Sequence, residues 1–465
     1  MLFHSIDFFL IFPIVIIGHF FIPNNRLRIF FLLIISYVFY MWNSPLNAIY
    51  LVFSTLVTYF IGIRIHFSKH KKSLLTIGLI LNLGLLFFFK AYEPFFPFLK
   101  DIFPKLPYKS FSIPLGLSFY TFQAVSYIFD IYRKRIEPET NFFDFSLFHS
   151  FFPQLMAGPI EKTKNLLPQL KVPQSINYQN FRRGALIFSF GLVKKLVVAD
   201  RLAALSGPIV DSLHYNTIYA TILGGYPVAF QYYFDFSAYS DIALGVALIM
   251  GIKLTRNFDS PFLAASPIDF WRRWHISFMN WLHDYVFMPI IELDFSFYNV
   301  VAATLVVFLI SGAWHGVGLR YIIWGFLNGT FVVLNILYRK FIRTKENKFL
   351  KPFKIIGTFH LFVISGFFLF QNEPFGIIKT ILTDFHLESY NLNPLFTKTP
   401  HFDSAIVFLA VPILMLGEII FSKLNFWEMF DKTPTLIRWS CYTAIMVILI
   451  LFSYTMARPY VYFKF

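Results

Sequence analysis

The sequence predicts an all-α, polytopic integral membrane protein. Of its 465 residues, 57% are hydrophobic and only 14% are charged, and the mean hydropathy is +0.61. A soluble protein of this length could not hide that much apolar surface from water, and runs of at least about 18 mostly apolar residues recur along the chain. The formal net charge is +15, with basic residues in short loops between the apolar runs. This placement indicates topology signals and lipid contacts, not a nucleic-acid partner.

The apolar runs and their flanking charges predict about 11–12 transmembrane helices, together with re-entrant or interfacial helices. The basic loop 64–72 is placed in the cytoplasm, which puts the N-terminus outside. The whole chain, 1–465, is predicted to be one membrane-embedded domain, with an N-terminal helical wall (1–110), a catalytic core (111–338) and a C-terminal helical wall (339–465). The predicted crossings are 3–21, 28–42, 46–63, 76–92, 114–132, 182–202, 218–250, 300–310, 321–338, 355–369, 404–421 and 439–457.

Four segments are not plain crossings. Residues 141–170 are apolar but interrupted by proline and glycine. They predict a re-entrant element lining a cavity, since irregular backbone at membrane depth needs protein or water around it. Residues 218–250 carry Asp235 and Asp241 in an apolar run, which predicts either one long broken helix or two short ones. Residues 93–112 and 372–402 are placed on the outer side.

Missing motifs narrow the chemistry. Cys441 is the only cysteine, so no internal disulfide and no thiolate metal cluster can form within the chain, and no metal site is expected. The sequence contains no Walker A loop, no G-x-S-x-G, no G-x-G-x-x-G and no H-E-x-x-H. A covalent serine, nucleotide-driven or zinc-protease mechanism is therefore unsupported. Direct transfer from a bound acyl donor, with a histidine as base, fits the residues that are present.

The stretch 258–328 holds the candidate site, and its first half predicts an amphipathic helix over 269–285. Two interpretations of His275 stay open: a buried, hydrogen-bonded member of a packing face, or a functional group. His283 is interpreted as an ordinary polar-face residue. The predicted apolar face comprises Trp271, Trp274, His275, Phe278, Leu282 and Tyr285, with Arg272, Arg273, Asn280 and Asp284 largely elsewhere.

The second half contains His315 between two strongly apolar runs. An imidazole in hydrocarbon is costly, which favours a functional role, although a structural histidine at a helix break is the alternative. Glycines on both sides permit close approach of backbone or ligand, Trp314 supplies a flat wall, and Ser311 is a possible hydrogen-bond partner. We place His275 toward the cytoplasmic face and His315 deep or near the outer side. A donor from the cytoplasm and an acceptor from outside would meet between them.

Five segments resemble the membrane-bound O-acyltransferase family, in particular its bacterial alginate and peptidoglycan O-acetyltransferase branch. The resemblance covers most of the chain and is densest between about residues 110 and 330. The segments are PLGLSFYTFQAVSYIFDIYR (114–133), FFPQLMAGPIEK (151–162), YFDFSAYSDIALG (233–245), DFWRRWHISFMNWLHDYVFMP (269–289) and SGAWHGVGLRYIIWG (311–325).

The resemblance implies a helical bundle around a central tunnel that joins a cytoplasmic and an outer funnel. It implies no bound cofactor, with acetyl-CoA or another acyl thioester as donor substrate. The implied acceptor is an extracytoplasmic polysaccharide, reached in this branch through a partner of the SGNH-hydrolase kind. The implied location is the bacterial cytoplasmic (inner) membrane. The family's histidine in the W-H-G context falls on His315, and the histidine of the W-R-R-W-H context on His275.

These observations give a hypothesis for each candidate residue. His315 is the general base, since a neutral imidazole suits that work near physiological pH, and His275 holds the donor or steadies developing charge. Arg272 and Arg273 attract donor phosphates or, equally, contact anionic lipid. The donor-binding candidates are Trp274, Arg272, Arg273 and Trp314. The candidates for the tunnel lining are Asp235, Tyr239, Asp241, Ser311 and Asn280. The first three of these could equally cap a broken helix.

Three other functions remain open from the sequence. A lipid-directed or D-alanyl-directed transferase would use the same chemistry on another acceptor. A transporter or flippase would use intramembrane His and Asp residues as a relay, and inverted repeats, which the sequence does not display, would favour it. A non-catalytic scaffold is the third.

Overall fold

The computed structural model describes residues 1–42, 44–104, 108, 111–212, 218–342, 347–370, 374–383, 401–423, 426–454 and 458–464. Within these ranges the regular structure is helical, as predicted, and no strand is present. The chain forms two compact units: residues 1–188, 240–256 and 462–465 make up unit 1, and residues 189–239 and 257–461 make up unit 2. Most of the predicted outer segment 372–402 lies outside the described ranges.

Seven helical segments of the described chain are long and apolar enough to cross a membrane, and a shorter apolar helix precedes them. Other predicted crossings coincide with helices that are shorter or more polar. The seven are Pro45–Phe67, Lys71–Ile102, Phe297–His315, Leu319–Phe341, Lys348–Leu369, Asp403–Ile420 and Thr435–Phe452.

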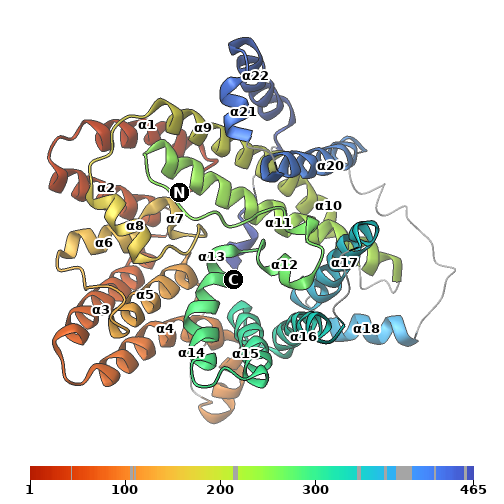
Figure 1. Cartoon of the computed structure of the whole chain (residues 1–465), viewed down its shortest axis with the longest axis horizontal. Helices are drawn as coiled ribbons and strands as arrows, with labels where there is room; N and C mark the ends of the chain where they lie inside the picture. The colour runs from red at the N-terminus through yellow and green to blue at the C-terminus, as the bar shows by residue number, and fades with distance from the viewer. Residues whose placement is uncertain are drawn as a thin grey trace. The chain divides into compact units, whose positions relative to one another are not determined.

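Unit 1 is built from the N-terminal helices (Figure 1). The helix α4 continues to Ile102 instead of ending near Tyr92, although it contains Pro94 and Pro97. Each proline removes one backbone donor, and contacts of the Tyr92 ring with Phe96 and Phe111 hold this region. The elements are α1 (Ile6–Phe21), α2 (Asn25–Met41), α3 (Ala48–Phe67), α4 (Lys71–Ile102), α5 (Leu117–Tyr132), α6 (Phe142–Ser150), α7 (Phe152–Leu155) and α8 (Thr163–Lys171).

The predicted break-up of residues 141–170 is confirmed, because α6, α7 and α8 replace a single span. The irregular backbone between α7 and α8 is buried inside unit 1; Ala157 and Glu161, for example, are at most 1% exposed. Protein therefore covers this backbone, as a broken segment in a membrane protein requires.

Two helices contribute to both units: α9 (Tyr178–Leu192) and α11 (Ile218–Ile249). Of the two forms predicted for residues 218–250, the structure has one long helix, with Pro227 inside it. The remaining α- and π-helices described in unit 2 are η2 (Val193–Ala199, a π-helix), α10 (Asp200–Ser212), α12 (Pro267–Trp271), α13 (Ile276–Leu282), η4 (His283–Phe287, also a π-helix), α14 (Met288–Ile291), α15 (Phe297–His315), α16 (Leu319–Phe341), α17 (Lys351–Phe370), α18 (Pro374–Thr383), α20 (His401–Lys423), α21 (Phe426–Lys432) and α22 (Thr435–Phe452).

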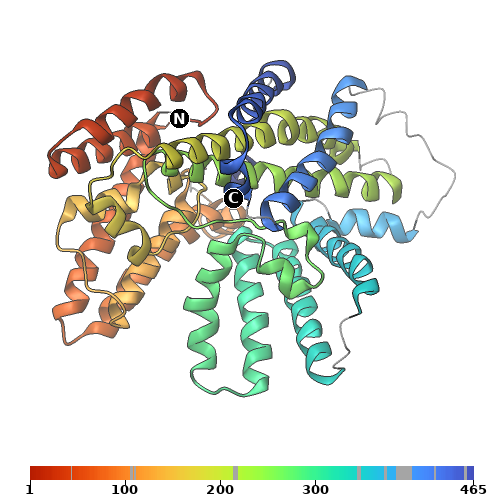
Figure 2. The ribbon, with the colours of Figure 1, turned by 45° about the horizontal axis from the view of Figure 1, so that its top comes forward.

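The helices α15 and α16 position His315, and they lie side by side (Figures 1 and 2). Two glycines let their backbones approach closely. A Cβ on Gly312 would lie 2.2 Å from the Tyr321 carbonyl oxygen, and one on Gly325 would lie 2.3 Å from the Phe308 carbonyl oxygen. Small residues at a helix crossing are typical of membrane bundles. The close approach at Gly312 lies three residues before the end of α15 at His315.

Candidate active site

The predicted helix over 269–285 is broken at His275, so that prediction is wrong. α12 ends at Trp271 and α13 begins at Ile276, with His275 between them at φ +47°. A non-glycine residue in this left-handed region is uncommon and needs support from its surroundings. Asn257 supplies it: its backbone carbonyl accepts from the Ile276 N–H at 2.9 Å, and its side-chain Oδ1 accepts from both the Ser277 N–H and the Ser277 hydroxyl, at 3.1 and 2.9 Å.

The same Asn257 oxygen determines which ring nitrogen of His275 carries the hydrogen. It lies 3.2 Å from His275 Nδ1, and because it already accepts two hydrogen bonds it is the carbonyl oxygen of the amide. His275 Nδ1 therefore donates, and Nε2 is the acceptor nitrogen of the neutral ring. The residue is 2% exposed, and burial lowers the pKa of His275 to about 3. The ring is neutral at physiological pH.

His315 is the last residue of α15, where the sequence predicted a loosened helix. Gly316 follows with extended backbone, and Gly318 has φ +150°, a conformation that favours glycine. The His315 side chain is 6% exposed. Its ring lies 4.5 Å from the Trp314 ring and 4.8 Å from the Trp324 ring between centroids, the second contact being edge-on. Ser311 lies one helical turn earlier and is also buried.

Both motif histidines, His275 and His315, contact the indole ring of Trp314. The Trp314 ring is 4.5 Å from the His315 ring and 6.1 Å from the His275 ring, and Phe278 packs against the same indole at 4.5 Å. The prediction that His275 lies toward the cytoplasmic face and His315 deep or near the outer side stays a prediction, because these ring contacts do not define depth in a membrane.

The remaining donor-binding candidates occupy different surroundings. Trp274 is 5% exposed inside an aromatic cluster, where its ring stacks on Phe270 at 5.6 Å and contacts Phe362 at 4.8 Å. Arg273 forms an ion pair with Asp269, with Nε and Oδ1 2.9 Å apart. Arg272 is exposed and forms part of the lining of two pockets.

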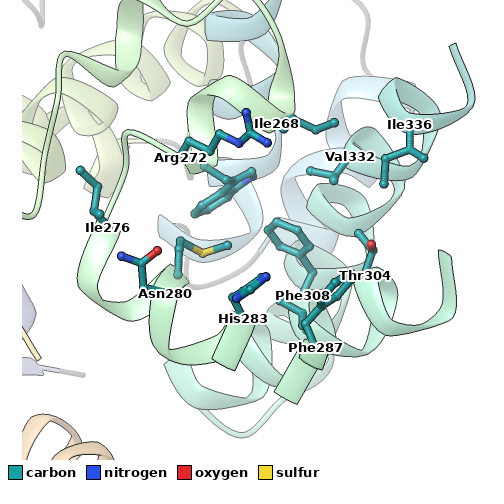
Figure 3. Close-up of a pocket in the computed structure, with 13 residues that line it drawn as sticks. Ile268, Arg272, Ile276, Asn280, His283, Phe287, Thr304, Phe308, Val332 and Ile336 are labelled. Carbon is teal, nitrogen blue, oxygen red and sulfur yellow. The ribbon is translucent and has the colours of Figure 1, made fainter. Parts of the chain in front are cut away.

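The first of these pockets, here called the apolar pocket, has a volume of about 560 Å³. Its lining comes from α12, α13 and η4 and from the facing helices α15 and α16 (Figure 3). On the side formed by α13 and η4 lie the predicted tunnel residue Asn280 and the polar-face residue His283. On the opposite side, Thr304 and Phe308 come from α15. Trp271, also in the lining, contacts Trp324 at 5.8 Å, and Trp324 in turn contacts His315. Two ring contacts therefore link this pocket to the His315 ring.

The second pocket, here called the basic pocket, has a volume of about 950 Å³ and lies between α12, the end of α16 and the start of α17. Among the described lining residues the one carboxylate is Asp269, and it is paired with Arg273. Such a concentration of cations attracts a multiply charged anion. The cationic lining residues are Arg272, Arg339, Lys348, Lys351 and Lys354.

The tunnel candidate Asp235 belongs to a buried ion network. Lys195 Nζ lies 2.7 Å from Asp235 Oδ1 and 2.8 Å from Asp200 Oδ1, and all three side chains are at most 4% exposed. The Val461 N–H donates to the other Asp235 oxygen at 2.6 Å, and the Tyr460 ring lies 4.3 Å from the ammonium. The alternative in which Asp235 caps a broken helix does not apply, because α11 is continuous there.

The last two tunnel candidates differ in burial. Tyr239 is 1% exposed, and its ring meets the Tyr460 ring edge-on at 5.0 Å, which attaches it to the same network. Asp241 is partly exposed and belongs to unit 1, whereas Tyr239 belongs to unit 2.

Three residues of this region were missed by the sequence reasoning. Asn257 precedes the predicted helix and carried no periodic signal. Trp324 was noticed only inside a motif, although an indole near the start of α16 faces the end of α15 when the two helices are antiparallel. Lys195, in an otherwise apolar run, did carry a signal: an intramembrane lysine needs an acidic partner, and Asp235 was already singled out.

Comparison with known proteins agrees with the motifs. The model of the membrane-bound O-acyltransferase family matches residues 133–372, which include both histidines. A probable alginate O-acetylase of Pseudomonas aeruginosa is 34% identical over 382 residues, covering 80% of this chain and 72% of that protein. A peptidoglycan O-acetyltransferase of Helicobacter pylori is 36% identical, covering 68% of this chain and 67% of that protein. A teichoic acid D-alanyltransferase of Bacillus subtilis is 28% identical, covering 60% and 74%. The chain therefore belongs to the membrane-bound O-acyltransferase family and is a multi-pass membrane acyltransferase.

Proposed function

We propose that this acyltransferase moves an acetyl group from a cytoplasmic thioester, acetyl-CoA, to a hydroxyl of an extracytoplasmic polysaccharide or partner protein, with His315 as general base. The observation that carries the proposal is the position of His315 at the end of α15, buried between Trp314 and Trp324 and sharing Trp314 with the second motif histidine. Aromatic walls exclude water, which favours transfer to a bound hydroxyl over hydrolysis.

The proposed step needs no covalent enzyme intermediate. A nitrogen of His315 takes the proton of the acceptor hydroxyl while the oxygen attacks the thioester carbonyl. The new ester C–O bond forms, the C–S bond breaks, and the proton passes from the imidazolium to the leaving thiolate. His315 returns to its neutral form, and no net proton is released or consumed. General base catalysis by a positioned side chain contributes typically about 100- to 10,000-fold to the rate.

His275 suits a holding role in this scheme. Its Nδ1 hydrogen is directed at Asn257, and Nε2 is an acceptor. A neutral imidazole in this tautomer accepts a hydrogen bond from an amide or hydroxyl of the donor. Stabilising a developing oxyanion would require a donor at Nε2 and hence a protonated ring, which burial opposes. Of the two roles predicted for His275, we therefore propose the first.

The two pockets support a donor with one charged and one apolar part. Arg272 lines both, so a single ligand lying across it would place phosphates in the basic pocket and a thioester arm in the apolar pocket. Arg273 already has Asp269 as partner, so we assign the phosphate contact to Arg272. If the basic pocket instead contacts anionic lipid, replacing Lys351 and Lys354 with glutamine would leave the KM for acetyl-CoA unchanged. A raised KM, with the same change at exposed Lys432 as control, supports the donor role.

Two named activities of relatives, on alginate and on peptidoglycan, support a polysaccharide of the cell envelope as acceptor. We further propose an SGNH-hydrolase-like partner as relay, a location in the bacterial cytoplasmic membrane and an N-terminus outside. The D-alanyl relative provides the rival: if membranes transfer D-alanine from a carrier protein and no acetyl group from acetyl-CoA, the acetyl assignment fails.

The test is O-acetylation of the envelope in cells that carry single variants. His315→Ala should abolish it while the protein still accumulates in the membrane. His360→Ala is the matched control, because His360 is exposed and, among the described residues, its ring forms a hydrogen bond with the carbonyl of Ile356 in its own helix. Unchanged O-acetylation in His315→Ala would refute the base assignment. Unchanged acetylation in His275→Ala alone would refute the holding role.

A further inference from the structure

A buried polar cluster that the proposed transfer does not use is centred on Glu418 in α20. The residue is 5% exposed. Lys194 Nζ lies 2.7 Å from Glu418 Oε1, and the Tyr233 hydroxyl donates to Oε2. The backbone carbonyl of Glu418 accepts from the Ser260 hydroxyl at 3.2 Å. All four residues belong to unit 2. Glu418 therefore joins α20 to η2, to α11 and to the loop that precedes α12.

The contact with Tyr233 leads to the candidate site through α11. The Tyr233 ring is fully buried and lies 5.8 Å from the Trp274 ring. Phe236, three residues later and so on the same face of the helix, meets the His275 ring edge-on at 4.7 Å. One face of α11 thus packs against both Trp274 and His275. Hydrogen bonds to an ionised carboxylate are short and strong, so Glu418 holds this face by the Tyr233 hydroxyl.

The contact with Ser260 reaches the same segment through the backbone. Ser260 has φ +47°, a left-handed conformation that is uncommon for a serine and persists only where its surroundings hold it. The preceding residue, Asp259, donates its N–H to the carbonyl of Arg273 at 3.0 Å. Arg273 lies two residues before His275, which also has φ +47°. The two left-handed residues therefore lie on either side of one backbone hydrogen bond, and Glu418 supports the first of them.

We propose that Glu418 is a positioning residue for the acyl transfer. Through Tyr233 and Ser260 it holds residues 273–276 in the place where His275 Nε2 meets the donor, without touching the donor itself. The inference rests on the donor-holding role proposed for His275. Small displacements matter in such a site, because a shift of about 1 Å can cost about 100-fold in rate. The C-terminal helix α20 is then part of the machinery of the site and not only a wall around it.

The first test is the KM for acetyl-CoA of the full-length Tyr233→Phe variant, which keeps the ring against Trp274 and loses only the hydroxyl. We expect the KM to rise about tenfold, the change that a loss of about 1.4 kcal/mol in binding produces, with kcat unchanged. Tyr59→Phe is the matched control, because the Tyr59 hydroxyl donates to the Thr140 carbonyl at 2.5 Å in unit 1. A merely structural hydroxyl would lower the unfolding midpoint in both variants and leave both KM values at the wild-type value.

Two double variants test Glu418 itself and decide the question if Tyr233→Phe fails to fold. Glu418→Gln and Glu418→Leu are each combined with Lys194→Met, so that no lone charge stays buried. Glutamine keeps an acceptor for the Tyr233 hydroxyl, and leucine removes it. We expect a KM near wild type for the glutamine variant and a KM raised about tenfold, as in Tyr233→Phe, for the leucine variant.

His275→Ala separates this inference from the function on which it rests. If His275→Ala raises the KM, an unchanged KM in Tyr233→Phe, or equal KM values in the two double variants, overturns the proposal. If His275→Ala leaves the KM unchanged, the donor-holding role fails and the inference falls with it. If the wild type transfers no acetyl group, the proposed function has failed, and hydrogen exchange decides about Glu418 alone. Faster exchange of the Ile276 and Ser277 amides in Tyr233→Phe then supports the positioning role, and unchanged exchange overturns it.

Discussion

The left-handed turn that carries His275 depends on one side chain, and Asn257→Ala removes it. The substitution takes one acceptor away from three buried groups: the Ser277 N–H, the Ser277 hydroxyl and His275 Nδ1. Leaving a buried donor unpaired costs about 1–3 kcal/mol. Allowing for relaxation and for entry of water, we expect a loss of about 3 kcal/mol in the free energy of unfolding, a large share of the total stability of an ordinary domain.

The assay is reversible unfolding of the purified protein in mixed micelles, followed by tryptophan fluorescence. Ser277→Ala is the matched control, because it removes only one of the three hydrogen bonds and leaves the others; its expected cost is about 1 kcal/mol. Acyl transfer measured on the same samples should fall more in Asn257→Ala than in Ser277→Ala, because only the first releases His275. Equal stabilities of Asn257→Ala and wild type would refute the reasoning.

Three other predictions follow from the described contacts. Gly312→Ala places a Cβ 2.2 Å from the Tyr321 carbonyl oxygen, so α15 and α16 must separate; we expect lower yield of folded protein and a loss of transfer activity of tenfold or so, measured on membranes matched for protein content. Lys195→Met leaves two buried carboxylates without their cation and should destabilise by about 3–5 kcal/mol, whereas Lys432→Met, which breaks an exposed pair, should change unfolding by less than about 1 kcal/mol. The pKa of His275 is lowered from 6.5 to about 3, so its contribution to stability is complete above pH 6.5 and declines as the pH falls toward 3; unfolding midpoints of His275→Gln should therefore fall less steeply over that window, and parallel curves would contradict this assignment.

The helical membrane class followed from hydropathy, because a bilayer needs long apolar runs whatever their packing. Positions of helix ends at His315 and of the breaks in residues 141–170 also followed, since glycine and proline act locally. The turn at His275 did not. Aromatic spacing over 269–285 fits one helix, and only the contact with Asn257, distant in sequence, overrides it.

In the candidate site, too, local features were predicted from the sequence and long-range contacts were not. Its two histidines stand in short motifs and were found from the sequence, whereas their common neighbour Trp314 was assigned only as a wall for one of them. The ion network of Lys195 joins residues 40 positions apart, and the two pockets combine α12 with helices much later in the chain. Such pairings depend on tertiary packing, which periodicity and local composition do not encode.

The central claim is that His315 moves the acceptor proton, and a single-turnover measurement tests it most directly. Purified protein in proteoliposomes receives acetyl-CoA labelled in the acetyl group, and formation of acetyl ester on a polysaccharide acceptor is timed for wild type, His315→Ala and His360→Ala. We predict a rate for His315→Ala lower by about 100- to 10,000-fold, with unchanged binding of acetyl-CoA and a His360→Ala rate equal to wild type. Ester formation by folded His315→Ala at the wild-type rate would contradict the account.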